Sequence, residues 1–402
     1  MQNFSGSRSG RPRRDPRSRS NSIDTHEGNF LLMRKDVPVC EFSLHSSSGA
    51  EYRIAVEVVN MFDEKRLPIE VQNYSHMGYF LVERFSPVFR GYLGNCIIVD
   101  GQPLNNSMRN IIEYTGGMSL VDDFWMKLPE DDHKTWEKCN PYDNEINEEV
   151  AALSFNGDGR YIASDFIISP EFTTDGMMDK AWRRIDGKTV LYKASAWWRN
   201  HGGVHFSEYY AAQIAELLEL RHVSYGLDVW FDRLCSTCEM FTSSKHSYIS
   251  GRKALAGDIG GFISSLDRDS QMYQDLADTV LFDAIIANGR HWGNFGFIQD
   301  NDTMELVRFS PIFDNGSALF NSVSDAELII PENTSMYYKM STRMYHQASI
   351  QEIRDMLTER QMALLPRMEG FEFKRHPEHN LSEGRLKVLE RIVQRRAAAL
   401  IP

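Results

Sequence analysis

Two short segments of this sequence carry side chains that could bind a metal ion around nucleotide phosphates. Asn294 lies in the stretch 287–297 (ANGRHWGNFGF), and Asp314 lies downstream in 311–316 (PIFDNG). An amide oxygen and a carboxylate, each set in a turn of glycine and aromatic residues after an apolar run, can ligate Mg²⁺. Each turn alone is a weak signal, because Asn-Gly and Asp-Gly pairs are ordinary turn formers.

The position five residues before Asn294 is occupied by Gly289. Phosphoryl-transfer sites of the protein-kinase type place a catalytic aspartate there, which accepts the proton of the attacking hydroxyl. The sequence therefore predicts that the metal-binding half of such a site is present and that its general base is missing. Asp283 lies at least one helical turn upstream and is a poor geometric substitute.

The elements needed to position this site occur in the required order. Residues 189–193 alternate and are rich in β-formers, so Lys193 is expected at the end of a strand. Kinase-type sites place their phosphate-binding lysine on such a strand. Residues 169–176 form a turn-rich segment that could present backbone N–H groups to phosphates. With a single glycine, this segment is by itself a weak signal for a phosphate loop.

Three helices are expected around these segments. Tyr210, Ile214, Leu217 and Leu218 have the spacing of an amphipathic helix, with Ser207 as its N-cap. Residues 272–284 predict a helix that leads into the Asn294 turn. Residues 386–400 predict a closing helix whose Arg391, Arg395 and Arg396 are expected on the solvent-exposed face.

Glu208 lies near the start of the first of these helices. From there it could reach Lys193 and form the lysine–glutamate ion pair that kinases need. The alternative is that Glu208 only complements the dipole of its own helix.

From about Ser119 to the C-terminus the sequence resembles the HipA-like serine/threonine kinases. The resemblance implies a bilobed, kinase-like α/β (α+β) fold with a strand-rich N-terminal lobe and a helical C-terminal lobe. It also implies ATP and Mg²⁺ as cofactors, a protein Ser/Thr as acceptor, and kinship with toxin–antitoxin kinases, hence an antitoxin-like protein partner. The segments that carry it are 119–125 (SLVDDFW), 169–176 (SPEFTTDG), 191–193 (LYK), 207–210 (SEYY), 238–241 (CEMF), 290–294 (RHWGN) and 311–314 (PIFD).

The resemblance implies roles for single positions. Lys193 would contact the ATP phosphates, and Asn294 and Asp314 would hold Mg²⁺. His291 would support the backbone of the catalytic-type loop, or else is only a polar loop residue. The family pattern Asp-x-His-x-x-Asn begins here with Gly289. The other nucleotide-binding positions are Thr173, Thr174, Gly176 and Glu208, together with Glu239, Met240 and Phe241 as the interlobe strand that meets adenine.

Thr173 also falls where the loop of this family carries a self-phosphorylated residue. Two functions of different classes follow from these assignments. The first is an ATP-dependent protein serine/threonine kinase that works with a displaced or substituted base. The second is a nucleotide-binding pseudokinase that acts as a regulatory or scaffold module. Position 289 divides the two, because a general base contributes roughly 10²–10⁴-fold to a reaction.

Composition agrees with a globular protein. Hydrophobic residues make up 42% of the chain and charged residues 25%, and no apolar run approaches the roughly 18 residues of a membrane span. Five cysteines at irregular spacing argue against a disulfide framework and for the cytoplasm. The lone CxxC at 235–238 is interpreted as packing beside the nucleotide, because a zinc site would need a second pair.

Charge is distributed unevenly. Residues 1–22 carry six arginines and one aspartate, a net charge of +5. Because the whole chain carries −12, the remainder carries −17. An acidic body repels DNA, so contact with nucleic acid is expected only through the arginine-rich tail or through a partner protein. The alternative interpretation, and the more common one for such a segment, is that the tail is a solvated extension.

The chain is expected to divide into four parts. Residues 1–26 are predicted to be a disordered Arg/Ser-rich tail, and residues 27–118 a small accessory domain. Residues 119–241 would form the strand-rich, nucleotide-binding lobe. Residues 242–402 would form the helical, catalytic-type lobe.

Overall fold

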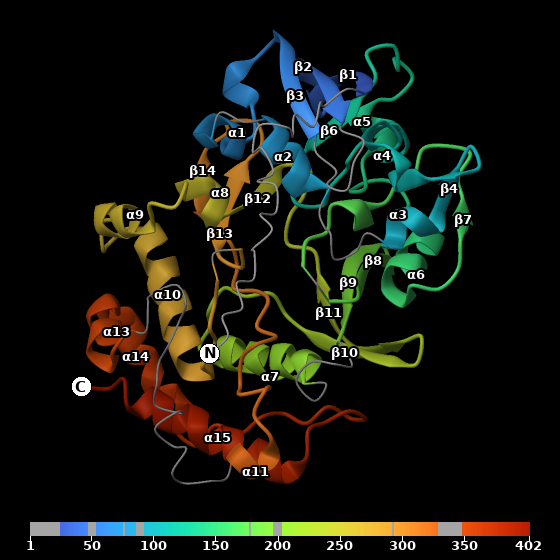
Figure 1. The fold of residues 1–402 in the computed structure, drawn as a ribbon. Helices are drawn as coiled ribbons and strands as arrows, with labels where there is room; N and C mark the ends of the chain where they lie inside the picture. Colours follow the sequence, from blue (N-terminus) through green and yellow to red (C-terminus); the bar gives the residue numbers. More distant parts are fainter. Residues whose placement is uncertain are drawn as a thin grey trace, which may run out of the picture.

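The computed structural model describes residues 25–46, 54–74, 77–85, 92–176, 178–195, 203–291, 293–328 and 348–402. Four sheets lie within residues 25–309 and the longest helices in the last third of the chain, so the predicted α+β fold with a strand-rich and a helical lobe is confirmed. In Figure 1 most strands lie in the upper part, the helix α7 (Val204–Leu217) lies at the level of the lowest strands, and α15 (Glu383–Ala398) lies below. The predicted tail lies outside the described residues up to position 24.

The N-terminal sheet has the strand order β3-β2-β1-β6 and is antiparallel throughout. Phe30 and Phe42 are fully buried and stack across β1 and β2 with ring centroids 5.7 Å apart. Since β6 lies past residue 118, this sheet extends across the boundary predicted there. Its strands are β1 (Thr25–Arg34), β2 (Val37–Ser46), β3 (Ile54–Met61) and β6 (Phe124–Lys127), and helices α1 (Ile69–Tyr74), α2 (Met77–Arg84) and α4 (Met108–Thr115) accompany it.

A second, small sheet has the order β5-β4-β7. It packs with α6 around a separate core that includes Ile97, Val150 and Leu153. Asn147 caps α6 by accepting from the Val150 N–H, and Gly157 ends it in the left-handed region. The elements are α3 (Tyr92–Cys96), β4 (Ile97–Val99), β5 (Gln102–Pro103), α5 (Trp136–Cys139), α6 (Glu148–Asn156) and β7 (Tyr161–Ile162).

The sheet that carries Lys193 has the order β10-β11-β9-β8, and α7 packs against β9 and β11. Lys193 lies in β9, one residue before its end, as predicted. The predicted N-cap is wrong, because α7 begins at Val204 and Ser207 lies a turn inside it, where its hydroxyl donates to the Ala318 carbonyl at 3.0 Å. The strands are β8 (Lys180–Ile185), β9 (Lys188–Ala194), β10 (Gly226–Trp230) and β11 (Arg233–Glu239).

A three-stranded sheet of order β12-β13-β14 begins the part predicted to be helical. It is tied to the N-terminal part through the Tyr248 N–H, which donates to the Val121 carbonyl at 2.7 Å, and through the ion pair of Lys253 and Glu70 at 2.6 Å. Its elements are β12 (His246–Ser250), α8 (Gly251–Leu255), α9 (Ile259–Ser265), β13 (Gly296–Asp300) and β14 (Leu306–Phe309).

The largest core lies where α7, α10 (Gln271–Ile286) and α15 meet. Both helices predicted from apolar spacing, over 272–284 and 386–400, are confirmed. Leu386, Leu389 and Val393 of α15 are buried because they recur on one face. Short helices α11 (Asp325–Leu328), α13 (Ile350–Met356) and α14 (Glu359–Leu364) complete this part.

The expectation that Arg396 is solvated is wrong. Its side chain is buried, and its Nε donates to the carbonyls of Ala284 at 2.7 Å and Ile285 at 3.1 Å, near the end of α10. A cation there meets the carbonyl groups that the last turn of a helix leaves unpaired. Over the described residues, none of the helices combines the length and the apolarity that a bilayer crossing requires.

Candidate active site

Lys193 joins two elements that are far apart in the sequence. Its Nζ donates to Glu208 Oε1 of α7 at 2.6 Å and to Asp314 Oδ1 in the loop after β14. The Glu208 side chain is 1% exposed and that of Asp314 is 34% exposed, so the ion-paired group opens to solvent on the side of Asp314. The contact with Lys193 shows that Glu208 does more than complement its helix dipole.

Burial and charge act in opposite directions on these three groups. Burial disfavours the charge on Lys193, but the carboxylates of Asp314 and Glu208 outweigh it and raise the pKa of the lysine. Burial likewise disfavours the Asp314 carboxylate, yet Lys193 holds the pKa of Asp314 below its usual value. The pKa of Glu208 is raised, because burial outweighs the attraction of Lys193. Lys193 and Asp314 are therefore both charged at neutral pH.

Asn294 lies against the same aspartate. Its Nδ2 is 2.5 Å from Asp314 Oδ2, so the two predicted metal ligands are adjacent although 20 residues separate them. Asp314 adopts a left-handed backbone with φ of 53°, and its N–H donates to the Tyr225 hydroxyl at 2.9 Å. Gly316 is required nearby, because a Cβ there would lie 2.6 Å from Val204 Cγ1.

A buried guanidinium connects the two loops that hold Asn294 and Asp314. Arg290 forms a two-pronged ion pair with Asp283 of α10, with bonds of 2.8 and 2.9 Å, and both side chains are at most 1% exposed. Its Nη1 donates to the carbonyls of Asn294 at 3.0 Å and Phe313 at 2.6 Å. Its Nη2 also donates to Asn315 Oδ1 at 2.7 Å. Because Asp283 is buried and engaged in this way, it is not placed to serve as the missing base.

Gly289 lies between two fixed neighbours, Asn288 and Arg290, which are both 2% exposed. Its φ lies outside the left-handed region, and a Cβ added there would meet no atom within 4 Å. The backbone therefore does not require glycine at this position. His291 is exposed, and its Nδ1 accepts from the Gly293 N–H at 3.1 Å, a contact in keeping with the predicted support of the loop backbone.

The segment 169–176 directly precedes β8 in the sequence. Thr173 donates its hydroxyl to the carbonyls of Met118 at 2.8 Å and Pro170 at 3.0 Å, and Thr174 donates to Pro170 at 2.8 Å. Both hydroxyls are thus directed into the protein. Gly176 has a φ of 95°, a backbone conformation that favours glycine, and it lies close to the end of the Lys180 side chain.

Lys180 was not identified from the sequence. It lies directly opposite Lys193 in the β8–β9 pairing, is 8% exposed, and is one of the cations that lower the pKa of Asp314. A sequence signal did exist. Asp186 and Gly187 form a two-residue turn with φ of 49° and 77°, and counting back from such a turn pairs residues 180 and 193.

The predicted adenine-binding residues, Glu239 to Phe241, begin at the last residue of β11. Glu239 ends the strand and its side chain pairs with Lys188 at the surface, while the Met240 N–H donates to the Thr189 carbonyl at 3.0 Å. The Phe241 ring packs 5.2 Å from the ring of Phe313, the residue before Asp314. Phe241 thus links the end of β11 to the predicted metal ligands Asn294 and Asp314, which we call the metal side.

The donor set of Asp314 and Asn294 fits Mg²⁺ brought by a nucleotide. Mg²⁺ keeps several waters and is usually held by one or two carboxylates and substrate phosphates, not by an all-protein cage. Over the described ranges, no group of three His, Cys, Asp or Glu side chains converges on one point. One carboxylate and one amide beside two lysines therefore suit a metal that arrives with phosphate.

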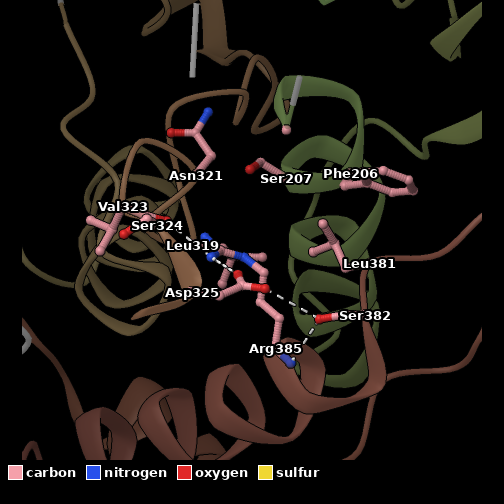
Figure 2. Close-up of a pocket in the computed structure, with 11 residues that line it drawn as sticks. Phe206, Ser207, Leu319, Asn321, Val323, Ser324, Asp325, Leu381, Ser382 and Arg385 are labelled. Carbon is pink, nitrogen blue, oxygen red and sulfur yellow. Dashed lines mark hydrogen bonds and ion pairs between the residues drawn. The ribbon is translucent and has the colours of Figure 1, made fainter. Parts of the chain in front are cut away.

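A pocket of about 330 Å³ lies elsewhere, between the start of α7, the segment after Asp314 and the start of α15 (Figure 2). Arg385 donates to Asp325 Oδ1 at 2.6 Å on its wall, and Ser382 is 3.4 Å from Asp325 Oδ2. None of the predicted nucleotide-binding or metal-binding residues lines it.

No family model and no curated protein matches this chain. Among solved structures, the chain is similar to the Helicobacter pylori proinflammatory kinase CtkA at 18% identity and a TM-score of 0.42, over 55% of this chain and 90% of that one. It is also similar to the Shewanella oneidensis MR-1 toxin–antitoxin complex of HipA, HipB and operator DNA at 12% identity and a TM-score of 0.43, over 92% and 96%. Neither similarity assigns a function, which depends on the side chains described above.

Proposed function

We propose that this chain is a HipA-like, kinase-type protein that binds ATP together with Mg²⁺ at Lys193, Asn294 and Asp314. The observation that carries the proposal is the ammonium of Lys193, held between Glu208 and Asp314. A lysine on a strand, its glutamate partner on the adjacent helix and a metal-binding aspartate are the parts that kinases bring together.

Each side chain has a task that follows from its position. Lys193 and Lys180 lie side by side on neighbouring strands and present two positive charges to nucleotide phosphates. Asp314 and the amide oxygen of Asn294 would hold the metal, which neutralises charge on the phosphates when bound. The backbone of residues 239–241 would meet the base. Both threonines of the 169–176 segment, Thr173 and Thr174, would need to give up their present hydrogen bonds to contact phosphate or to become phosphorylated.

Phosphate transfer to a protein Ser/Thr is the second part of the proposal, and we expect it to be slow. No carboxylate stands at position 289, and Asp283 is held by Arg290. A largely dissociative transition state demands less of a base than of positioning, so a low rate is compatible with this site. The same two observations favour the alternative, a pseudokinase in which nucleotide binding serves regulation.

Partners and location remain part of the proposal. An antitoxin-like protein partner rests on the sequence resemblance, and the arginine-rich tail proposed to contact nucleic acid lies outside the described residues up to position 24. All five cysteines are free, and burial raises the pKa of Cys40 and Cys235 to about 12, so neither is a reactive thiolate at neutral pH. Free thiols are in keeping with the proposed reducing cytoplasm.

Calorimetric titration with ATP in the presence of Mg²⁺ tests nucleotide binding. We expect heat of binding for the unchanged chain and little or none for Asp314→Ala. Asp132→Ala removes an exposed carboxylate outside this site and should bind like the unchanged chain. Absence of binding at millimolar ATP, with the protein shown to be folded, would contradict the proposal.

A further inference from the structure

Over the described residues, no backbone hydrogen bond joins residues 290–295, which carry Asn294, to residues 311–316, which carry Asp314. Asn294 lies between α10 and β13, and Asp314 follows β14. Two ligands of one metal must nevertheless keep a fixed separation, because Mg²⁺ demands near-ideal octahedral geometry. A group that binds both loops would fix the separation between the two ligands.

Arg290 makes these contacts. The carbonyl of Phe313 immediately precedes Asp314, and the side-chain amide of Asn315 immediately follows it. The guanidinium therefore forms hydrogen bonds with the chain on both sides of the aspartate. The same guanidinium binds the backbone carbonyl of Asn294 itself. Its remaining two N–H groups go to Asp283, so all five donors are used within the protein.

We propose that Arg290 is a positioning residue, which fixes the separation of Asn294 and Asp314 and thereby sets the affinity for the metal that accompanies the nucleotide. This inference rests on the proposed function. Asp283 anchors the guanidinium to α10, whose Leu281, Phe282 and Ile285 are fully buried in the core. The positions of Asn294 and Asp314 are therefore fixed by the helical core through Arg290. They do not depend on the residue at position 289.

A second buried arginine provides a matched control. Arg34 binds both oxygens of Asp123, at 2.8 and 3.1 Å, and both side chains are 1% exposed. It links the N-terminal sheet to Asn301, after β13, at 3.2 Å, and contacts none of the predicted site residues. Its removal should disturb stability without disturbing the metal side.

The experiment compares Arg290→Lys with Arg34→Lys in the full chain. ATP binding is titrated calorimetrically in EDTA and at a series of Mg²⁺ concentrations, after circular dichroism has shown each variant to be folded. We expect Arg290→Lys to raise the half-saturating Mg²⁺ concentration at least roughly tenfold, since groups that orient metal ligands typically account for 10–100-fold in affinity. Binding in EDTA should stay within about twofold, and Arg34→Lys should leave both values unchanged.

Each result has a distinct meaning. If the unchanged chain binds no ATP, the proposed function and this inference fail together. If it binds and Arg290→Lys has the same Mg²⁺ dependence, only the role of Arg290 is overturned. Should Arg290→Lys fail to fold, Asp283→Asn takes its place, because it weakens the anchor and keeps a similar shape. We then expect a several-fold rise in half-saturating Mg²⁺, and an unchanged value would overturn the inference.

Discussion

Two buried cations, Lys193 and Arg290, contact the same loop around Asp314 and are used differently. Lys193 contacts the Asp314 carboxylate, whereas Arg290 binds the carbonyl before Asp314 and the amide after it. Lys193 uses two N–H groups, and its third has no partner among the described residues. Arg290 uses all five, and its side chain is 1% exposed against 11% for Lys193.

This difference separates a cation that can serve a ligand from one that serves the protein. An ammonium whose third N–H has no partner among the described residues, and which lies beside a partly exposed carboxylate, can exchange partners when a phosphate arrives. A guanidinium whose planar fork is saturated by fixed acceptors cannot do so without leaving several of them unpaired. The comparison therefore predicts that substitution of Arg290 acts mainly on stability and metal affinity, and that substitution of Lys193 acts mainly on nucleotide binding.

The largest effect is expected from Arg290→Met. It would leave the fully buried Asp283 carboxylate without a cation, with only the Asn288 side-chain amide donating to it at 3.2 Å. It would also remove a donor from the carbonyls of Asn294 and Phe313 and from the Asn315 amide oxygen. Breaking one partner out of a buried ion pair typically costs about 3–5 kcal/mol, and we expect a loss in that range from urea denaturation of the ligand-free protein. A loss below about 1 kcal/mol would mean that the pair is not as closely held as its distances indicate.

A smaller effect is expected when acid charges a buried histidine beside this site. His205, one turn before Glu208 on α7, is 6% exposed, and burial, assisted by His379, lowers its pKa from 6.5 to about 4. Between these values the unfolded chain binds a proton that the folded chain does not. Stability contributed by the neutral ring is therefore complete above pH 6.5 and falls by up to about 3 kcal/mol toward pH 4.

Denaturation curves collected from pH 7 to pH 4 measure this contribution. In His205→Gln the stability should depend less on pH over that window, because glutamine does not titrate. Carboxylates with lowered pKa values, such as Asp314, contribute in both proteins and cancel in the difference. Identical pH profiles for the two proteins would show that His205 titrates normally.

Lys193→Met should cost less than Arg290→Met. Its removal leaves Glu208 with the Ser236 hydroxyl as a partner, and no backbone carbonyl loses a donor, because Lys193 Nζ donates to the two carboxylates. Asp314 is partly exposed and can be solvated. We expect a loss of about 1–2 kcal/mol in the ligand-free protein, with ATP binding abolished. Equal losses for the two variants would remove the distinction between the two cations.

The parts of this site that were predicted correctly are those that depend on residue types and spacing within short stretches of the sequence or on the family pattern. The strand around Lys193, the helix entering the Asn294 turn, and the contact of Glu208 with Lys193 are all confirmed. Each depends on a period of two or 3.6 residues or on a family pattern. Lys180 was missed because its place opposite Lys193 depends on counting through the Asp186–Gly187 turn, a step that strand propensity alone does not include.

The errors lie where tertiary contacts overrule local preference. Ser207 looks like an N-cap from its position before an apolar series, but its hydroxyl instead reaches Ala318 and the helix begins three residues earlier. Arg396 looks solvated on a basic helix face, but the end of α10 supplies carbonyl acceptors that make its burial tolerable. The contacts of Arg290 with both loops could likewise not be predicted from the sequence, because three of its five acceptors come from residues 294, 313 and 315.

Gly289→Asp is expected to have the smallest effect on stability, and its main effect should be on the rate of phosphate transfer. The added side chain enters open space on a backbone that does not require glycine, so stability should change by no more than about 0.5 kcal/mol. The carboxylate would stand five residues before Asn294, where it can accept the proton of a Ser/Thr hydroxyl. Because Asn288 and Arg290 hold the backbone on both sides, the new side chain should be placed without rearrangement of the metal side.

We expect Gly289→Asp to raise the rate of phosphate transfer from ATP to protein at least roughly tenfold, the low side of what a positioned base supplies. Transfer of labelled γ-phosphate should be measured at saturating ATP and Mg²⁺, so that a change in affinity does not pass for a change in chemistry. Gly289→Asn is the matched control, since it has nearly the same shape and no basic carboxylate, and it should add nothing. If the unchanged chain already transfers phosphate briskly and the aspartate has no effect, a base outside position 289 performs this step. In that case the interpretation that the catalytic base is missing at position 289 has to be abandoned.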